Sequence, residues 1–332
     1  MIIDVHSHLH TKGVEELLGQ PLVDDLNCFR RFDTDEGRVQ GHKFHQSITP
    51  ILFSLDIRLK DLDRMGIEKQ LISPSPGQRH YWCDPEVAEK IARLENDNVA
   101  KQVAEHPDRF FGICVLPLQD MDLALRVLDR SLGELDMKGI LIDTAIGDME
   151  LSDPHLEPLW ARAEELDVPF LLHPHLGFPH GERLSNYYMI NITGNLIELT
   201  LGLTHLAMGG VLERHPRLKI CSVHGGGYLP THFGRLDRGY KIDARPDSKR
   251  HISKPPSEYL KQVFYDTVLF DPDEVTILVN RFGADHVLMS TDYPHDLGHE
   301  DPLAFINSMP GLSAGEKAQI NGGNAQAMFK LG

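Results

Sequence analysis

One stretch near the middle of the chain decides the fold class. Residues 139–142 read Gly139-Ile140-Leu141-Ile142, residues 154–166 carry apolar side chains at helical spacing, and residues 169–172 read Pro169-Phe170-Leu171-Leu172. Runs that are apolar at every position are typical of strands covered on both faces. Asp153 and Pro154 stand where the cap and the first turn of a helix are expected. The stretch therefore predicts a strand, a helix and a second, parallel strand.

The same pattern repeats along the whole chain. Short apolar runs, each followed by turn residues and a segment of helical spacing, lie at residues 2–5, 70–73, 110–116, 139–142, 169–172, 219–223, 263–267 and 287–290. Eight strands alternating with helices predict a (β/α)8 TIM barrel. A doubly wound open sheet is disfavoured, because its usual glycine-rich turn does not follow residues 2–5.

Two stretches depart from this alternation. Residues 10–55 are polar and rich in glycine, and they join the first strand to a helix expected to begin near Leu55. We expect them to form a small insertion, a lid over the barrel mouth, within a single domain of residues 1–332. Residues 241–257 are rich in Pro, Arg and Lys, and a long loop of this kind is usually functional or lies at an interface.

The composition excludes several classes of partner. The net charge is −16 and no basic run of five residues occurs, which argues against binding to nucleic acid or to an anionic membrane. No segment reaches the ~18 consecutive apolar residues of a membrane span. Residues 1–5 lack the features of a signal peptide, so we expect a cytoplasmic protein. The four cysteines are far apart, which argues against a disulfide framework or a thiolate metal site.

Histidines gather where the expected strands end. In a barrel of this type the reactive groups lie at the carboxyl ends of the strands. The side chains found there follow the first, fifth, sixth and eighth runs, and they are His6, His8, His173, His175, His224 and Asp292. Because these ends meet at one face of the barrel, we expect the side chains to lie close together.

Four of these residues form a donor set for a divalent metal. Three neutral imidazoles and a carboxylate suit zinc or a similar ion and leave a position for water or substrate. We therefore predict that His6, His8, His173 and Asp292 bind one divalent ion per chain, with Zn²⁺ expected and Mn²⁺ as the alternative. Asp292 is also a candidate catalytic residue, because it could hold water at the metal.

His224 has two interpretations: a further ligand in a two-metal site, or a general base beside one metal. Many two-metal barrels bridge their ions with a carboxylated Lys at the end of the fourth strand. Here Lys138 precedes that strand, at the opposite end. A single metal is favoured, which frees His224 for proton transfer. The three glycines at residues 225–227 fit equally well a tight turn from strand to helix.

At this point the sequence resembles a known family. Asp4-Val5-His6-Ser7-His8, the segment from His224 to Arg235 and Thr291-Asp292-Tyr293-Pro294 are similar to motifs of the amidohydrolase superfamily, in the branch of aminocarboxymuconate-semialdehyde decarboxylase. The resemblance extends from residue 1 to about residue 329. It implies a metal-dependent (β/α)8 barrel, usually a homodimer, that removes CO₂ without oxidation from aromatic or dienoic acids.

The resemblance also points to residues that would contact substrate. His175 stands where the decarboxylase has Trp, and His295 stands where it has Phe. Arg245 matches a carboxylate-binding Arg that a neighbouring subunit contributes. A second such Arg, in the first insertion, has no clear counterpart, because the local sequence is Lys43-Phe44-His45-Gln46. We therefore take His175, His295 and Arg245 as candidate substrate-binding residues.

Together these features predict a metal-dependent carboxy-lyase for a small aromatic or muconate-like carboxylic acid. The alternative is a hydrolase or hydratase of a small carboxylate-bearing substrate that uses water activated at the same metal. A non-catalytic barrel that binds a metal or a partner is a third possibility, since a fold does not fix a function.

Overall fold

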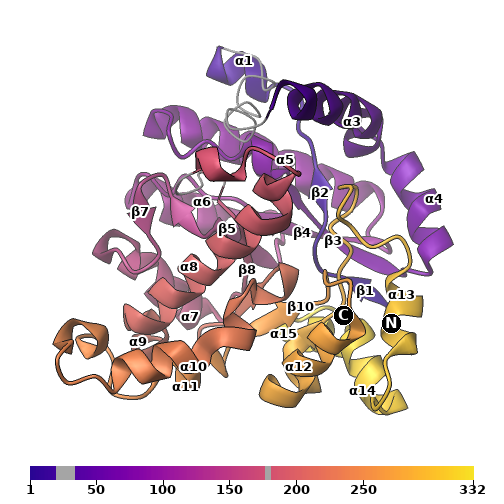
Figure 1. Cartoon of the computed structure of the whole chain (residues 1–332). Coiled ribbons are helices and arrows are strands. Elements are labelled where there is room, and N and C mark those ends of the chain that lie inside the picture. The colour runs from indigo at the N-terminus through magenta and orange to yellow at the C-terminus, as the bar shows by residue number, and fades with distance from the viewer. Residues whose placement is uncertain (20–33, 176–180) are drawn as a thin grey trace.

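Parallel strands form the centre of the molecule, which the computed structural model describes at residues 1–19, 34–175 and 181–332. The hydrogen-bonded order is β1 (Ile3–Asp4), β3 (Lys69–Pro74), β4 (Phe110–Cys114), β5 (Gly139–Asp143), β8 (Phe170–His173), β9 (Ile220–Ser222), β10 (Phe264–Asp266) and β11 (Val287–Leu288) (Figure 1). The short strand β2 (His8–Leu9) also pairs with β3. The Val5 amide donates to the Met289 carbonyl at 3.2 Å and closes the ring. The (β/α)8 barrel is confirmed.

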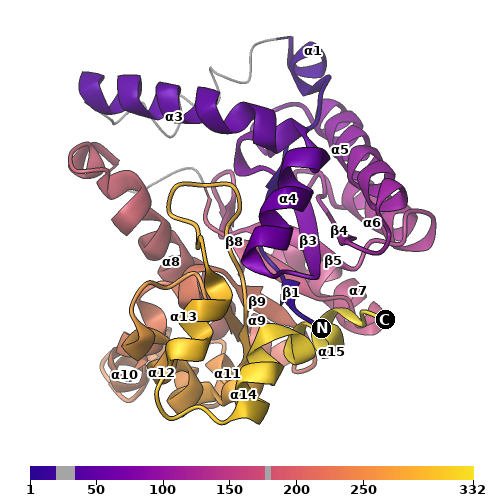
Figure 2. The ribbon, with the colours of Figure 1, turned by 90° about the vertical axis from the view of Figure 1, so that its right-hand side faces the viewer.

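Helices connect successive strands and cover the outside of the ring (Figures 1 and 2). They are α4 (Leu55–Met65), α5 (Pro85–Glu105), α6 (Met121–Gly133), α7 (Glu157–Leu166), α8 (Asn195–Met208), α9 (Val211–Arg214), α10 (Leu229–Tyr240), α11 (Pro256–Leu260), α12 (Pro272–Phe282), α13 (Pro302–Ser308), α14 (Ala314–Ala318) and α15 (Asn324–Phe329). Asp153 accepts from the His155 amide, as expected of a cap, although a 3-10 turn precedes α7 there.

The core lies between the strands and this outer layer of helices. Most apolar side chains of the barrel strands are buried, and Trp160 of α7 packs against Phe170 of β8 with ring centroids 5.0 Å apart. The register of β5 and β8 sets Asp143 beside His173 at the carboxyl end of the strands. The apolar packing thus fixes the positions from which the polar residues at the strand ends project.

The insertion after the first strand contains two helices, α1 (Val14–Leu18) and α3 (Asp35–Phe53). Thr34 caps α3 by accepting from the Gly37 amide. Both views show α3 extending across one end of the barrel (Figures 1 and 2), and α4 begins at Leu55 as expected. Residues 20–33 of the expected insertion lie outside the described residues.

Two other connections also differ from simple turns. A hairpin of β6 (Ala145–Ile146) and β7 (Met149–Glu150) follows β5 and was not apparent from the sequence. The segment between α10 and α11 contains a single short 3-10 turn and is otherwise irregular, as predicted for residues 241–257. Within the described ranges, no helix is long and apolar enough to cross a membrane.

Candidate active site

The four predicted metal ligands meet at the carboxyl ends of the strands. Nε2 of His6 lies 3.1 Å from Nε2 of His8, and Oδ1 of Asp292 lies 3.4 Å and 3.0 Å from these two atoms. His173 joins them, with its ring centroid 5.4 Å from that of His6 and 5.1 Å from that of His8. All four residues are buried. The structure thus brings these four side chains together at the strand ends.

The chemistry and spacing of these donors fit a divalent metal. Bonds of about 2.0–2.1 Å to nitrogen and oxygen place neighbouring ligand atoms about 3 Å apart. The separations among His6, His8 and Asp292 have this size. Two overlapping groups could hold an ion: His6 with His173, His224 and Asp292, and His8 with Asp292 and His295. The set combines imidazoles with one carboxylate, as zinc and similar ions require.

Asp4 holds the first and last parts of the barrel together beneath the site. Its buried carboxylate accepts from the backbone amides of His6 at 3.1 Å and Thr291 at 2.9 Å, and from Nε2 of Gln70 at 2.7 Å. The Asp292 amide in turn donates to the His6 carbonyl at 2.9 Å. These bonds fix the distance between the His6 and Asp292 backbones.

Sequence reasoning missed a second carboxylate, that of Asp266 at the end of β10. Its Oδ2 lies 3.1 Å from Nδ1 of His6, and its Oδ1 accepts from the Gly225 and Val268 amides. A carboxylate on the far nitrogen of a metal-binding histidine fixes the tautomer and the ring orientation. Its place at the carboxyl end of a predicted strand, residues 263–267, was the signal that could have found it.

His224 lies beside the cluster on a tight turn. Its Nε2 is 3.7 Å from Oδ2 of Asp292 and is buried without a hydrogen-bond partner. Gly227 has φ of 66°, and a Cβ there would lie 2.3 Å from the Leu196 carbonyl oxygen. The glycines are therefore needed for the turn. The position of His224 is compatible with either a ligand or a proton-transferring group.

The electrostatics favour an ionised carboxylate at Asp292 but differ among the imidazoles. Burial alone would lower the pKa of His6, but Asp292 and Asp266 outweigh it and raise that pKa above the usual histidine value. Burial lowers the pKa of His8, His173 and His224 below the usual histidine value. Burial alone would raise the pKa of Asp292, but the surrounding imidazoles outweigh it and hold that pKa well below the usual range. Neutral imidazoles and an ionised carboxylate are the forms that bind metals, so a metal would have to displace any proton that His6 carries beyond its neutral form.

Arg79 is a further residue that the sequence did not reveal. Its buried guanidinium lies 2.6 Å from Oδ1 of Asp143 through Nε, and 3.0 Å from Nδ1 of His173 through Nη2. Nδ1 of His175 lies 3.6 Å from the other oxygen of Asp143. His175 thus faces Asp143 at the strand ends.

A cavity of about 570 Å³ opens above the cluster. His173, His224 and Asp292 lie in its wall, together with His295, while α3 contributes apolar side chains such as Phe44. No Lys or Arg among the described residues lines it. His175 is likewise not among the described lining residues, whereas His295 is.

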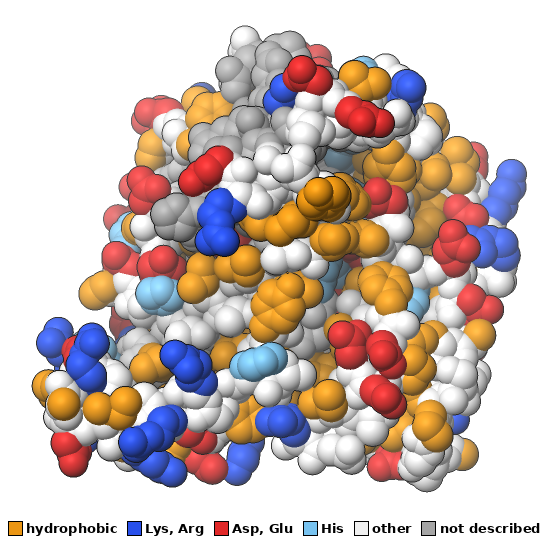
Figure 3. Space-filling view, in the orientation of Figure 1, with side chains coloured by type: hydrophobic (Ala, Val, Ile, Leu, Met, Phe, Trp, Pro, Cys, Tyr) orange, Lys and Arg blue, Asp and Glu red, His pale blue; other side chains and the backbone are white. Residues whose placement is uncertain are grey.

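Arg245 lies far from the cavity within its own chain. It is exposed and pairs with Asp247 at 2.8 Å, in the segment between α10 and α11. Both ribbon views place that segment at the opposite end of the molecule from α3. Figure 3 shows Lys and Arg side chains gathered over this corner, at the lower left. Arg245 can therefore reach such a cavity only in another copy of the chain.

Comparisons with known proteins agree with this geometry. The family model described as amidohydrolase matches residues 3–331. A 2-amino-3-carboxymuconate-6-semialdehyde decarboxylase from Dictyostelium discoideum is 33% identical over 99% of this chain and 91% of the relative. A gamma-resorcylate decarboxylase from Rhizobium sp. is 30% identical over 89% of this chain and 93% of the relative.

A solved structure shares the fold and carries a metal. The dihydroxybenzoic acid decarboxylase from Polaromonas sp., with bound manganese and the inhibitor 2-nitroresorcinol, has a TM-score of 0.81 and 26% identity, covering 99% of this chain and 97% of that one. Because the family model spans the chain almost from end to end and the relatives match over most of their length, this chain belongs to the amidohydrolase family.

Proposed function

We propose that this chain is a metal-dependent, non-oxidative carboxy-lyase that acts on a small aromatic or muconate-like carboxylic acid. The observation that carries the proposal is the meeting of His6, His8, His173, His224 and Asp292 at the strand ends, where His173, His224 and Asp292 lie in the wall of a large cavity. The relatives named above are decarboxylases of acids of this kind, which supports the same reaction class.

The metal would be held by His6, His8, His173 and Asp292. When bound, it supplies a Lewis acid that polarises substrate oxygens and lowers the pKa of a coordinated water. We expect zinc, because imidazoles dominate the donor set, with manganese as the alternative since a similar structure holds it. Asp266 orients the His6 ring, and Asp4 fixes the backbone that carries the ligands.

Decarboxylation needs a proton at the carbon that loses CO₂. We assign its delivery to Nε2 of His224, which is buried in the cavity wall and lacks a hydrogen-bond partner. Because the His224 ring is otherwise neutral, it first takes up a proton from solvent. The carbon–carbon bond then breaks, its electron pair stays on the carbon that carried the carboxyl group, and the proton from the imidazolium takes the place of that group, which leaves as CO₂. The ring is neutral again at the end of the step.

The cavity wall suggests how the acid is held. Apolar side chains of α3, including Phe44, Ile48 and Leu52, would contact the ring, and His295 would donate to polar substituents. We keep His175 and Arg245 as proposed substrate-binding residues, Arg245 through a homodimer. In this proposal the whole chain acts as one domain, with residues 10–55 as the lid. The cytoplasmic location stays a prediction, to be checked by fractionation.

Product analysis tests the reaction class. The protein, loaded with Zn²⁺ or Mn²⁺, is incubated with benzoates that differ in hydroxyl and amino substituents and with 2-amino-3-carboxymuconate-6-semialdehyde, in water labelled with oxygen-18. We expect release of CO₂ and no label in the organic product. Incorporated oxygen-18 with the carboxyl group retained would support the alternative, a hydratase or hydrolase. A metal-loaded protein that releases CO₂ from none of these acids would contradict the proposal.

A further inference from the structure

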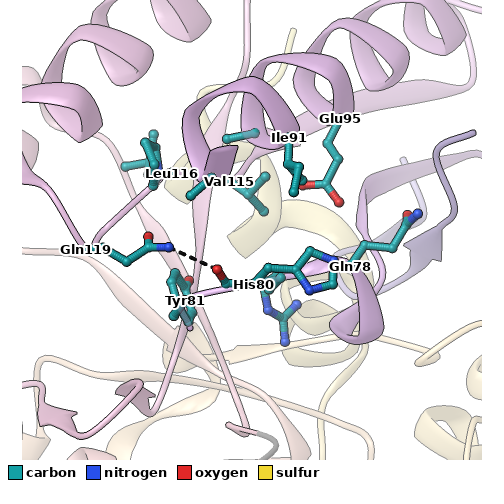
Figure 4. Close-up of a pocket in the computed structure, with 12 residues that line it drawn as sticks. Gln78, His80, Tyr81, Ile91, Glu95, Val115, Leu116 and Gln119 are labelled. Carbon is teal, nitrogen blue, oxygen red and sulfur yellow. Dashed lines mark hydrogen bonds between the residues drawn. The ribbon is translucent and has the colours of Figure 1, made fainter. Parts of the chain in front are cut away.

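A second, much smaller cavity lies behind the site. It has a volume of about 20 Å³ and separates α5 from the loop that follows β3. Ser75, Pro76 and Gly77 of this loop line the large cavity, and the next residues, from Gln78 to Tyr81, line the small one. Figure 4 shows Glu95 reaching from α5 toward the part of the loop that carries Gln78 and His80. The loop is therefore a partition between the two cavities.

Polar atoms without partners surround the small cavity. Among the described lining residues, Nη1 of Arg79, Oε1 of Glu95 and Oε1 of Gln119 are buried and make no hydrogen bond. A buried water needs about 10–15 Å³ and two to four polar partners. The cavity meets both conditions, so a water there could accept from Arg79 and donate to Glu95 or Gln119.

Arg79 meets the metal site on its other side. Its Nη2 lies 3.0 Å from Nδ1 of His173, and the Pro174 carbonyl oxygen lies 3.1 Å from the same nitrogen. A guanidinium only donates hydrogen bonds and a carbonyl only accepts them. Nδ1 of His173 can therefore satisfy one of these two neighbours and not both.

The choice between the two neighbours decides whether His173 can bind a metal through Nε2. If Nδ1 accepts from Arg79, the proton of the neutral ring is on Nε2 and blocks that atom. If Nδ1 carries the proton and donates to the Pro174 carbonyl, the lone pair of Nε2 is available. The second arrangement requires the N–H groups of Arg79 to find other acceptors, and Asp143 and the small cavity provide them.

We propose that Arg79 is a positioning residue that sets the tautomer of His173. When a metal binds, Asp143 and the small cavity accept the hydrogen bonds of Arg79, so that Arg79 no longer donates to Nδ1 of His173. The proposal rests on the proposed function, because it requires His173 to be a ligand. It makes Asp143 a determinant of metal affinity although it does not belong to the predicted ligand set.

Two variants test the proposal, because they should change the affinity for Mn²⁺ in opposite directions. Asp143→Asn weakens the ion pair with Arg79, so that Arg79 donates to Nδ1 of His173 instead. We therefore expect Mn²⁺ to bind about tenfold more weakly. The electron paramagnetic resonance signal of free Mn²⁺ measures this affinity. Adding Arg79→Met removes the competing donor and should restore the affinity. The double variant Asp129→Asn/Arg162→Met, an exposed ion pair at 3.0 Å, serves as the control and should bind as the wild type does.

If Arg79 and Asp143 only supported the structure of the site, the double variant should bind Mn²⁺ more weakly than Asp143→Asn alone, because losing both partners would disturb the site more than losing one. Unchanged Mn²⁺ affinity in Asp143→Asn, or no recovery in the double variant, would overturn the proposal. If His173→Ala binds Mn²⁺ as tightly as the wild type, the proposed metal site itself is wrong. That result can be distinguished from a failure of the tautomer proposal, because it does not involve Arg79.

Nitrogen-15 NMR of the histidines tests the tautomer in the unaltered protein, whatever the stability of the variants. The His173 signal is assigned by its loss in His173→Ala. We expect the proton on Nε2 in the metal-free protein and on Nδ1 after Zn²⁺ is added. A metal-free His173 that already carries its proton on Nδ1 would overturn the proposal.

Discussion

His224 and Asp292 share an unusual backbone conformation. Their φ angles are 50° and 59°, in the left-handed region that residues other than glycine seldom adopt. His224 stands two residues after β9 and Asp292 four residues after β11, so both lie beyond the carboxyl ends of buried strands. Backbone of this kind clusters at functional sites, because surrounding contacts must hold it in place. Here the contacts of Asp4 and Asp266 do so.

Replacement of His173 tests the ligand set. We expect the purified protein to hold about one divalent ion per chain, and His173→Ala to lose it, because one of four donors is gone. Metal analysis of both proteins after identical dialysis measures this. Two tightly held ions per wild-type chain would contradict the single-metal site.

Replacement of His224 separates its two interpretations. As a proton-transferring group, its removal in His224→Ala should leave the metal content unchanged and lower turnover by ~10²–10⁴-fold. The same samples are used for metal analysis and for the CO₂ assay. A parallel loss of metal and activity would show that His224 is a ligand.

At the level of single residues, the sequence predicted which candidate metal ligands lie together better than it predicted the residues around them. His6 and His8 share one side of an extended chain, and their position after the first run was visible. The roles of Asp266 and Arg79 depend on which neighbour each side chain meets across the barrel. Those contacts join residues far apart in the chain, such as Arg79 and Asp143, and no local pattern marks them.

The glycine turn after β9 is a test at the level of elements. Gly227→Ala places a Cβ 2.3 Å from the Leu196 carbonyl oxygen of α8 at a positive φ, so either the turn or the helix must shift. We expect a lower Tm and weaker activity, because His224 stands on this turn. Gly234→Ala is the matched control: nothing lies within 4 Å of its Cβ, and alanine favours the helix by up to ~1 kcal/mol. Equal Tm values for the two variants would contradict the packing described.

The strands were predictable from the sequence, and the helix of the insertion was not. Strands buried on both faces appear as continuous apolar runs, and all eight were found within a few residues of their observed bounds. Residues 35–53 contain Gly37, Gly41 and Pro50, which lower helix propensity. The helix α3 forms there because Thr34 caps it and because Phe44, Ile48 and Leu52 share a face that lines the cavity.

At the scale of the whole molecule, the negative charge bears most on how an acidic substrate could bind. The chain has a net charge of −16, and no described residue lining the cavity is Lys or Arg. Burial, together with His45 and His295, lowers the pKa of His10 in the wall to about 3, so this histidine is neutral near pH 7. The binding of an anionic substrate would then depend on the metal and on positive charge from outside the described cavity wall.

A second copy of the chain could provide that charge. We predict a homodimer in which Arg245 reaches the partner's cavity, so that Arg245→Ala raises KM and leaves the metal content unchanged. Mixing Arg245→Ala chains with His224→Ala chains should restore part of the activity, since one site of each mixed dimer regains both residues. A monomer by light scattering, or no recovery in verified mixed dimers, would contradict the shared site.

The central claim is metal-dependent loss of CO₂, and isotope labelling measures it directly. The acid turned over fastest is labelled with carbon-13 in its carboxyl group and incubated in D₂O with the metal-loaded protein. We predict one ¹³CO₂ and one deuterium, at the carbon that lost the carboxyl group, for each product molecule. Chelation of the metal should stop the release of ¹³CO₂ and the incorporation of deuterium, and added Zn²⁺ or Mn²⁺ should restore them. A product that retains the labelled carboxyl group, or release of ¹³CO₂ that continues after complete removal of the metal, would contradict the account.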